Sequence, residues 1–259
     1  MSAATENGSR TRRIGLIVPS SNTTIETEVP AMLARADLGV PVTFHSSRAV
    51  LHSVDEESLD RMVAESDRCA SELADARVDV IAYACLVALM ARGAGAHEEV
   101  EKRLTEVVAA SGAEAPIVSS AGALIRGLRG RGIERVAIMT PYMPPLTKLV
   151  ADYLEAYGIE VVDSLSLAVA DNVEVGRLAQ EGLRDHARDL DLSRAQTLIA
   201  SCCVQMPSLE VLDLLEGDTG LPVISAATAT AAEVLDALGL DRKVPGAGSL
   251  LAGSSASPS

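Results

Sequence analysis

Short apolar runs alternate along the chain with longer stretches whose apolar residues recur at helical spacing. The first run, Ile14–Val18, is bounded by a proline and predicts a buried strand. The polar residues after it are turn and cap residues, which predicts a helix over about 24–35. The same criteria predict strands over 40–49, 78–83 and 116–120, and helices over 53–76, 98–110 and 121–131. Alternating strands and helices predict parallel sheets with right-handed crossovers, an α/β fold.

The second half of the chain repeats the elements of the first half in the same order. IERVAIMTPYMPPLTKLVADYL resembles RRIGLIVPSSNTTIETEVPAML, with Pro141 opposite Pro19. AQTLIASCCVQM resembles VDVIAYACLVALM, so that Cys203 and Cys85 each follow a strand. The repeat predicts two pseudo-symmetric Rossmann-like lobes, each a parallel sheet of about four strands flanked by helices, with the active site in the cleft between the lobes.

The repeat also sets the predicted division of the chain. We expect the first lobe over residues 12–120 and the second over 121–225. A last helix, over 226–240, is expected to pack back onto the first lobe. Residues 1–11 are small and polar, and 245–259 are rich in Gly, Ser, Ala and Pro, so both ends are predicted to be disordered.

Composition narrows the function classes. Apolar residues make up 48% of the 259 residues and aromatic residues 2%, which suits a core of Ala, Val, Leu and Ile between buried parallel strands and helices. The net charge of −14 argues against nucleic acid and anionic membranes as partners. A chain with four cysteines, no apolar run of membrane-spanning length and no recognisable signal peptide is expected to be cytoplasmic, with reduced thiols.

Candidate chemistry lies where strands end, because ligands of open parallel sheets bind at the carboxyl ends of the strands. If the strand ends of the two lobes face each other, they form one cleft with a thiol on each side. No glycine-rich nucleotide motif follows any strand. The candidates at these ends are Ser20, Ser21, Asn22, Cys85, Tyr142, Asn172 and Cys203.

Several of these candidates have plain structural interpretations. Asn22 is a good helix cap, Asn172 a good turn residue, and Tyr142 could simply pack. Cys69 lies on a helix face and is expected in the core. If the strand continues, Cys202 points away from the cleft and packs, although the reverse assignment of Cys202 and Cys203 stays open. Strain argues against a bond between these neighbours, and neither CxxC nor histidines at ligand spacing support a metal site.

A planar carbon held between two thiols can be attacked on one face and protonated on the other. The thiolate is the reactive form, so the pKa of the attacking thiol is expected to fall below about 8.5. We expect helices to begin just after Cys85 and Cys203, the second of them near Pro207. Their N-terminal dipoles would lower the thiol pKa and favour carboxylate ligands.

The stretches GLIVPSSNTTIETEVP, AYACLVALM, MTPYMPPL and CVQMPSL resemble the maleate cis-trans isomerases of the aspartate/glutamate racemase superfamily, over nearly all of residues 13–238. Amino-acid racemases of that superfamily usually carry Asn-Thr after the first cysteine. Here Leu86 and Val87 follow Cys85, and Val204 follows Cys203, where the racemases carry Thr. Arylmalonate decarboxylases are similar but keep only the second cysteine, whereas this chain has both.

The resemblance implies isomerisation of maleate to fumarate without an organic or metal cofactor, in a homodimer or higher homo-oligomer. It implies Cys85 as nucleophile and Cys203 as partner acid. We also expect lobe closure, or closure of the loop over 19–22, to exclude water. A racemase or arylmalonate-type decarboxylase on this scaffold, and a non-enzymatic dicarboxylate-binding protein, remain alternatives. Implied substrate-binding residues are Asn22, Tyr142 and Asn172, with Ser20, Ser21, Leu86, Val87 and Val204 beside them.

Overall fold

The computed structural model describes residues 10–253, and the predicted disorder of 1–9 and 254–259 lies outside the described residues. Each lobe contains one four-stranded parallel sheet, in the order β2-β1-β3-β4 and β6-β5-β7-β8. The identical order confirms the predicted α/β class and the repeat. The strands are β1 Arg12–Pro19, β2 Val42–Ala49, β3 Val80–Tyr83, β4 Ile117–Ser119, β5 Arg135–Thr140, β6 Glu160–Ser166, β7 Thr197–Ser201 and β8 Val223–Ser225.

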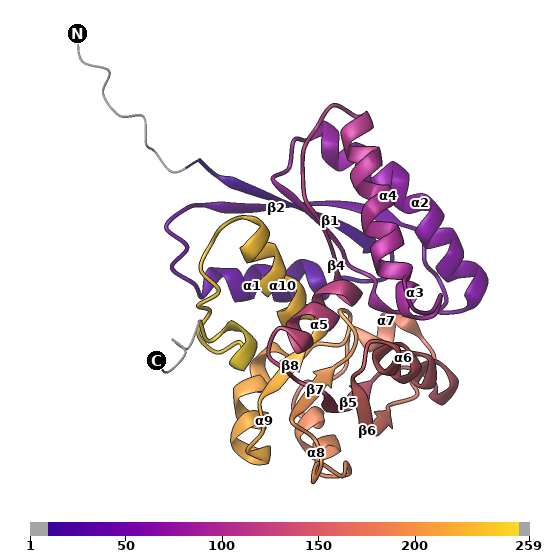
Figure 1. The fold of residues 1–259 in the computed structure, drawn as a ribbon, viewed down its shortest axis with the longest axis vertical. Coiled ribbons are helices and arrows are strands. Elements are labelled where there is room, and N and C mark those ends of the chain that lie inside the picture. The colour runs from indigo at the N-terminus through magenta and orange to yellow at the C-terminus, as the bar shows by residue number, and fades with distance from the viewer. Residues whose placement is uncertain (1–9, 254–259) are drawn as a thin grey trace.

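Helices flank both sheets, and the two lobes lie against each other (Figure 1). Helices α2 and α4 lie on the first lobe, and α6, α8 and α9 lie on the second. The helices are α1 Ile25–Ala34, α2 Glu56–Asp75, α3 Leu86–Met90, α4 Ala96–Ala110, α5 Ser120–Arg129, α6 Pro144–Ala156, α7 Asn172–Val175, α8 Gly182–Ala187, α9 Leu212–Thr219 and α10 Ala226–Ala237. No helix of the described range is long and apolar enough to cross a membrane.

Local sequence explains why these elements form and pack. Residues 14–19 of β1 and all of β3 are buried, as the continuous apolar runs predict. Gly15 lets α2 approach β1 closely, because a Cβ at this position would lie 3.0 Å from Val78 Cγ2 and 3.2 Å from Leu73 Cδ1. The long helix α2 begins where Asp55 accepts a hydrogen bond from the Ser58 amide, at 2.9 Å.

The last helix joins the two halves of the molecule. α10 follows β8 of the second sheet, yet it packs against α5, α1, β3 and β4 (Figure 1). Its first turn is closed by a capping box between Ser225 and Thr228. The exact lobe boundaries, 12–120 and 121–225, stay a prediction.

The chain after α10 corrects one expectation. Residues 245–253 were predicted to be disordered, but Leu250 and Leu251 are buried in a 3₁₀ turn over Ser249–Leu251. The Arg131 guanidinium donates to the carbonyls of Ser249 and Leu250, at 2.9 and 3.1 Å. Burial of the apolar surface of Leu250 and Leu251 stabilises an ordered segment despite the high Gly and Ser content around them.

We expect Leu251→Ala to lower the free energy of unfolding by about 2–4 kcal/mol, because it leaves a cavity in a fully buried site. Leu214→Ala is the matched control, since Leu214 is 49% exposed on α9. Urea denaturation followed by circular dichroism measures both. An equal, small effect of the two substitutions would show that this C-terminal segment does not contribute to stability.

Candidate active site

The carboxyl ends of β1, β3, β5 and β7 meet at one cavity between the two lobes. Its volume is about 20 Å³, which is room for about one water molecule. No charged side chain belongs to its wall. The wall contains Pro19, Asn22, Leu51, Val54, Ala84, Cys85, Leu86, Val87, Tyr142, Asn172, Cys203, Val204 and Gln205.

The structure brings nearly all of the predicted site residues to this cavity. The exceptions are Ser20 and Ser21, which lie behind the wall. The Ser20 hydroxyl accepts a hydrogen bond from the Leu51 amide at 3.0 Å. The Ser21 hydroxyl accepts one from the Asn172 side chain at 2.5 Å. These two serines therefore contact wall residues and do not line the cavity.

Cys85 lies between β3 and α3, as expected, and is 4% exposed. The predicted fall of its pKa is wrong for this closed site. Burial raises the pKa of the Cys85 thiol to about 12, and the hydrogen bond from the Ala88 amide only partly opposes that rise. α3 has five residues, all buried, so its few free N–H groups cannot offset desolvation of a thiolate.

Cys203 lies in a turn, and the helix expected to begin near Pro207 begins a few residues later in the chain. A 3₁₀ turn over Leu209–Val211 comes first, and α9 begins at Leu212. The Ser201 hydroxyl instead holds the turn by donating to the carbonyls of Cys203 and Met206, at 2.7 and 2.9 Å. A side chain that bonds these carbonyls competes with helix formation here.

The acidity of Cys203 is set by burial and by neighbouring donors. Burial raises the pKa of its thiol, while the Tyr142 hydroxyl and the Gln205 amide act in the opposite direction. The Gln205 N–H lies 3.4 Å from the Cys203 sulfur. Cys202 is fully buried outside the cavity wall, and its amide donates to Met139 O at 2.9 Å. Of the two neighbours, Cys203 therefore lines the cavity.

The remaining polar residues of the wall are neutral donors. Burial raises the pKa of Tyr142 well above its usual value, so its hydroxyl stays protonated. The Asn22 amide donates to Val204 O at 3.5 Å, and its carbonyl accepts from the Ile25 amide at 3.2 Å. Asn22 thus both lines the cavity and caps α1. Neutral donors in a dry site can bind carboxylates without a cationic side chain.

Sequence reasoning missed Gln205 and Arg48, which tie the first-lobe loop over 19–24 in place. The Gln205 side chain is buried and donates to the carbonyls of Ser21, at 3.1 Å, and Asn172. Arg48 donates to the carbonyls of Ser20 and Asn22, at 3.0 and 2.7 Å. The available signal for Gln205 was a polar residue inside the apolar stretch SCCVQMP.

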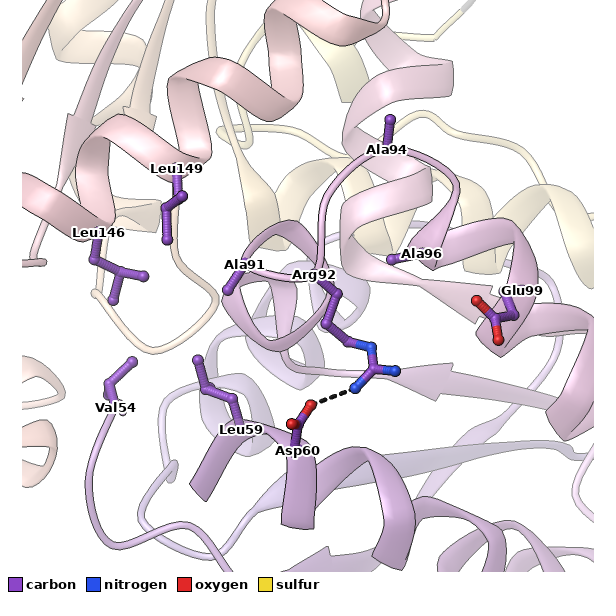
Figure 2. A pocket seen from close by; sticks show the side chains of 10 residues that line it. All are labelled: Val54, Leu59, Asp60, Ala91, Arg92, Ala94, Ala96, Glu99, Leu146 and Leu149. Atoms are coloured by element: carbon purple, nitrogen blue, oxygen red, sulfur yellow. Dashed lines mark hydrogen bonds and ion pairs between the residues drawn. The ribbon is translucent and has the colours of Figure 1, made fainter. Parts of the chain in front are cut away.

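A larger groove lies beside the cavity (Figure 2). It has a volume of about 550 Å³ and is formed by Leu59, Ala91 and Arg92 of the first lobe with Leu146 and Leu149 of the second, among others. Arg92 forms an ion pair with Asp60 in its wall. Val54 belongs to both walls, so the groove adjoins the cavity that contains the thiols.

The raised thiol pKa values predict slow alkylation. At pH 7.5, we expect Cys85, Cys202 and Cys203 to react with iodoacetamide at least about tenfold more slowly in the folded protein than in urea, since less thiolate is present. Peptide mass spectrometry resolves each cysteine. Folded-state labelling of Cys85 at the rate of the unfolded chain would contradict the burial account.

Two lobes with parallel sheets of the same strand order, and a cavity-lining thiol at one strand end of each, define the class of the protein. It is a two-lobe α/β protein with a pair of cysteines in the cavity between the lobes. A model of the arylmalonate decarboxylase family matches residues 14–251. The maleate isomerase of Geobacillus stearothermophilus is 52% identical over 93% of this chain and 97% of its own length. A maleate isomerase structure from Pseudomonas putida S16, with maleate, is 47% identical with a TM-score of 0.92, over 95% of this chain and 99% of that one.

A Nocardia farcinica maleate cis-trans isomerase is similar to the same extent. Its structure, a cysteine-to-serine mutant with a covalently bound succinylcysteine intermediate, is 50% identical with a TM-score of 0.91, over 93% of this chain and 98% of that one. This chain belongs to the maleate isomerase family.

Proposed function

We propose that the protein catalyses the cis-trans isomerisation of maleate to fumarate without a cofactor. One observation carries the proposal: Cys85 and Cys203, from equivalent strand ends of opposite lobes, line the same cavity among neutral hydrogen-bond donors. A flat alkene between two thiols can be attacked at one carbon and protonated at the other. The relatives that carry maleate or a succinylcysteine intermediate support the same chemistry.

The first half of the reaction breaks the π bond. The Cys85 thiolate adds to one alkene carbon, and the π electrons move onto the other carbon and its carboxylate as an enediolate. The Cys203 thiol then gives its proton to that second carbon, which leaves a succinyl thioether on Cys85 and a thiolate on Cys203. The former double bond is now a single bond and rotates freely.

The second half reverses these steps from the rotated geometry. The Cys203 thiolate removes the proton from the second carbon, the double bond forms again, and the Cys85 thiolate leaves. The product is fumarate, and both sulfur atoms regain their starting protonation states. No electrons enter or leave, so the cycle balances without an oxidant or reductant.

Neutral donors stabilise the charge that develops on the carboxylate. Tyr142, Asn22 and Asn172 supply a hydroxyl and two amides at the wall of the cavity. Backbone N–H groups of Leu86, Val87 and Val204 lie beside the two thiols. Donors that are already fixed before the enediolate forms stabilise it without reorganising, which lowers the barrier.

The site has to open during each cycle, because the closed cavity is too small for a four-carbon dicarboxylate. Opening also lowers the pKa of the Cys85 thiol, which burial raises in the closed site. A solvated thiol has a pKa near 8.5, so a few per cent of Cys85 is thiolate at neutral pH when water enters. Closure around maleate then excludes water from the enediolate. We expect the loop over 19–22 to be a segment that closes, as the sequence predicts, because Pro19 and Asn22 line the cavity.

The two-thiol cycle predicts that Cys85→Ala and Cys203→Ala each lower kcat about a thousandfold or more, because each removes a group that no neighbour replaces. Proton NMR of maleate and fumarate follows the reaction. Cys202→Ala is the matched control and should keep most of the activity, since Cys202 is outside the cavity wall. Near-full activity of either cavity variant would reject the mechanism.

The same assay separates the alternative reactions. A decarboxylase would release CO₂ from an arylmalonate, a racemase would exchange the α-proton of an amino acid, and a binding protein would leave maleate unchanged. In Cys203→Ser, incubation with maleate should add the mass of one maleate to Cys85, because a proton from water can complete the succinyl adduct, whereas release needs the missing Cys203 thiolate to remove that proton. An adduct on Cys203 of the Cys85→Ser variant alone would reverse the two roles.

Tyr142→Phe should lower kcat about tenfold to a hundredfold, since it removes one donor to the enediolate. Because the pKa of Tyr142 is raised far above neutrality, the wild-type hydroxyl remains a donor from pH 6 to 9, so the ratio of the two kcat values should be constant over this range. A ratio that falls toward one as the pH rises would contradict a protonated donor.

A further inference from the structure

Glu28 is a buried carboxylate that the proposed mechanism does not use. It lies on α1 of the first lobe and is 6% exposed. Its Oε1 atom accepts hydrogen bonds from the backbone amides of Ser208 and Leu209, both at 2.6 Å. Its Oε2 atom is buried without a hydrogen-bond partner among the described residues. A carboxylate from one lobe thus binds two N–H groups of the other.

These two amides end the loop that carries Cys203. Ser201 holds the loop at its start, Gln205 ties its middle to Ser21, and Glu28 binds its end. The Ser208 and Leu209 amides begin a 3₁₀ turn, where N–H groups have no partner within the turn. In Glu28 the first lobe supplies that partner. Glu28 therefore links the position of the Cys203 loop to the helix that follows the loop over 19–24.

The charge of Glu28 also acts on Cys203. A nearby negative charge opposes formation of a thiolate, and Glu28 raises the pKa of Cys203 in addition to burial. Tyr142 opposes this rise, and Cys85 and Cys202 are the other titratable groups close to Cys203. Burial raises the pKa of Glu28 itself; the Ser208 and Leu209 amides oppose that rise, and Glu210 adds to it. Glu210 is paired with Arg35.

We propose that Glu28 is a positioning residue for Cys203: from the first lobe, its carboxylate fixes the end of the second-lobe loop that carries the thiol, through the amides of Ser208 and Leu209. This inference rests on the proposed function. It also explains how two buried thiols in one cavity take different roles. The thiol in the loop that Glu28 holds is the proton donor, and the thiol at the start of α3 is the nucleophile.

Glu28→Gln tests the charge, because the amide keeps the shape and one acceptor oxygen. We expect kcat for maleate to fall about tenfold or more, as small misplacements of reacting groups do. The alkaline limb of the kcat profile, where Cys203 loses its proton, should move to lower pH, because removing a negative charge lowers the pKa of the thiol. If the alkaline limb and kcat of Glu28→Gln both match those of the wild-type protein, the inference is overturned.

A second readout does not depend on turnover. Alkylation of Cys85 and Cys203 by iodoacetamide is followed against pH, with tandem mass spectrometry assigning each site. Glu28→Gln should move the midpoint of Cys203 to lower pH and leave that of Cys85 in place. A merely loosened structure would speed the labelling of both thiols and move both midpoints to lower pH, because burial raises the pKa of each, and that outcome would also overturn the inference.

Two further variants complete the test. Glu210→Gln is the matched control, since it removes an exposed carboxylate from the same loop and should leave kcat and the Cys203 midpoint unchanged. Glu28→Asp keeps the charge but shortens the reach, so kcat should fall while the Cys203 midpoint stays near wild type. If Glu28→Gln does not fold, Glu28→Asp decides the question, because full activity of Glu28→Asp would reject the positioning role. If the wild-type protein does not isomerise maleate, but Glu28→Gln still shifts the Cys203 midpoint, then only the maleate reaction is rejected.

Discussion

The site depends on hydrogen bonds that cross from one lobe to the other. Each lobe contributes one strand-end loop with one thiol that lines the cavity, and the wall of the cavity contains residues of both lobes. Gln205 of the second lobe binds the first-lobe loop at Ser21, and Asn172 binds the Ser21 hydroxyl. Glu28 of the first lobe binds the second-lobe loop at Ser208 and Leu209. The Glu28 bonds are buried and the bonds at Ser21 are partly buried, so breaking one of them leaves a polar group with few other partners, and this holds the two thiol loops at one cavity.

Among the described residues, the cavity wall contains no charged side chain, and this determines how a substrate can bind. The protein carries a net charge of −14, yet the proposed substrate is a dianion. The described wall has no cationic side chain to offset this charge, so binding relies on amide and hydroxyl dipoles in a space from which water is expelled. The same dryness raises the pKa of both thiols and of Tyr142. The proposed opening of the site would therefore control both access to the thiols and their reactivity.

Scarce aromatic residues gather where the lobes meet. Tyr142 lines the cavity, and Tyr153 and Tyr157 of the second lobe pack against His97 of the first, with ring centroids 6.1 and 5.2 Å from the imidazole. His97 Nδ1 lies 2.5 Å from the Tyr153 hydroxyl. Burial lowers the pKa of His97, which favours a neutral ring at this junction. Apart from Tyr83 and Phe44, the rest of the core is almost entirely non-aromatic, and it forms one cluster that runs through both lobes.

The sequence by itself determined the main strands and helices, the repeat and the pairing of Cys85 with Cys203. The reason is that the spacing of apolar residues and the position of a residue after a strand are local properties of the chain. It also found Asn22, Tyr142 and Asn172, since each follows a strand. Only the tertiary structure separated Cys203 from Cys202 and replaced the expected helix after Cys203 with a turn. The same holds for Gln205 and Glu28, whose partners lie more than a hundred residues away in the chain. The pKa of Cys85 belongs to this second group, because burial from both lobes, which no local pattern encodes, outweighs the short helix beside the thiol.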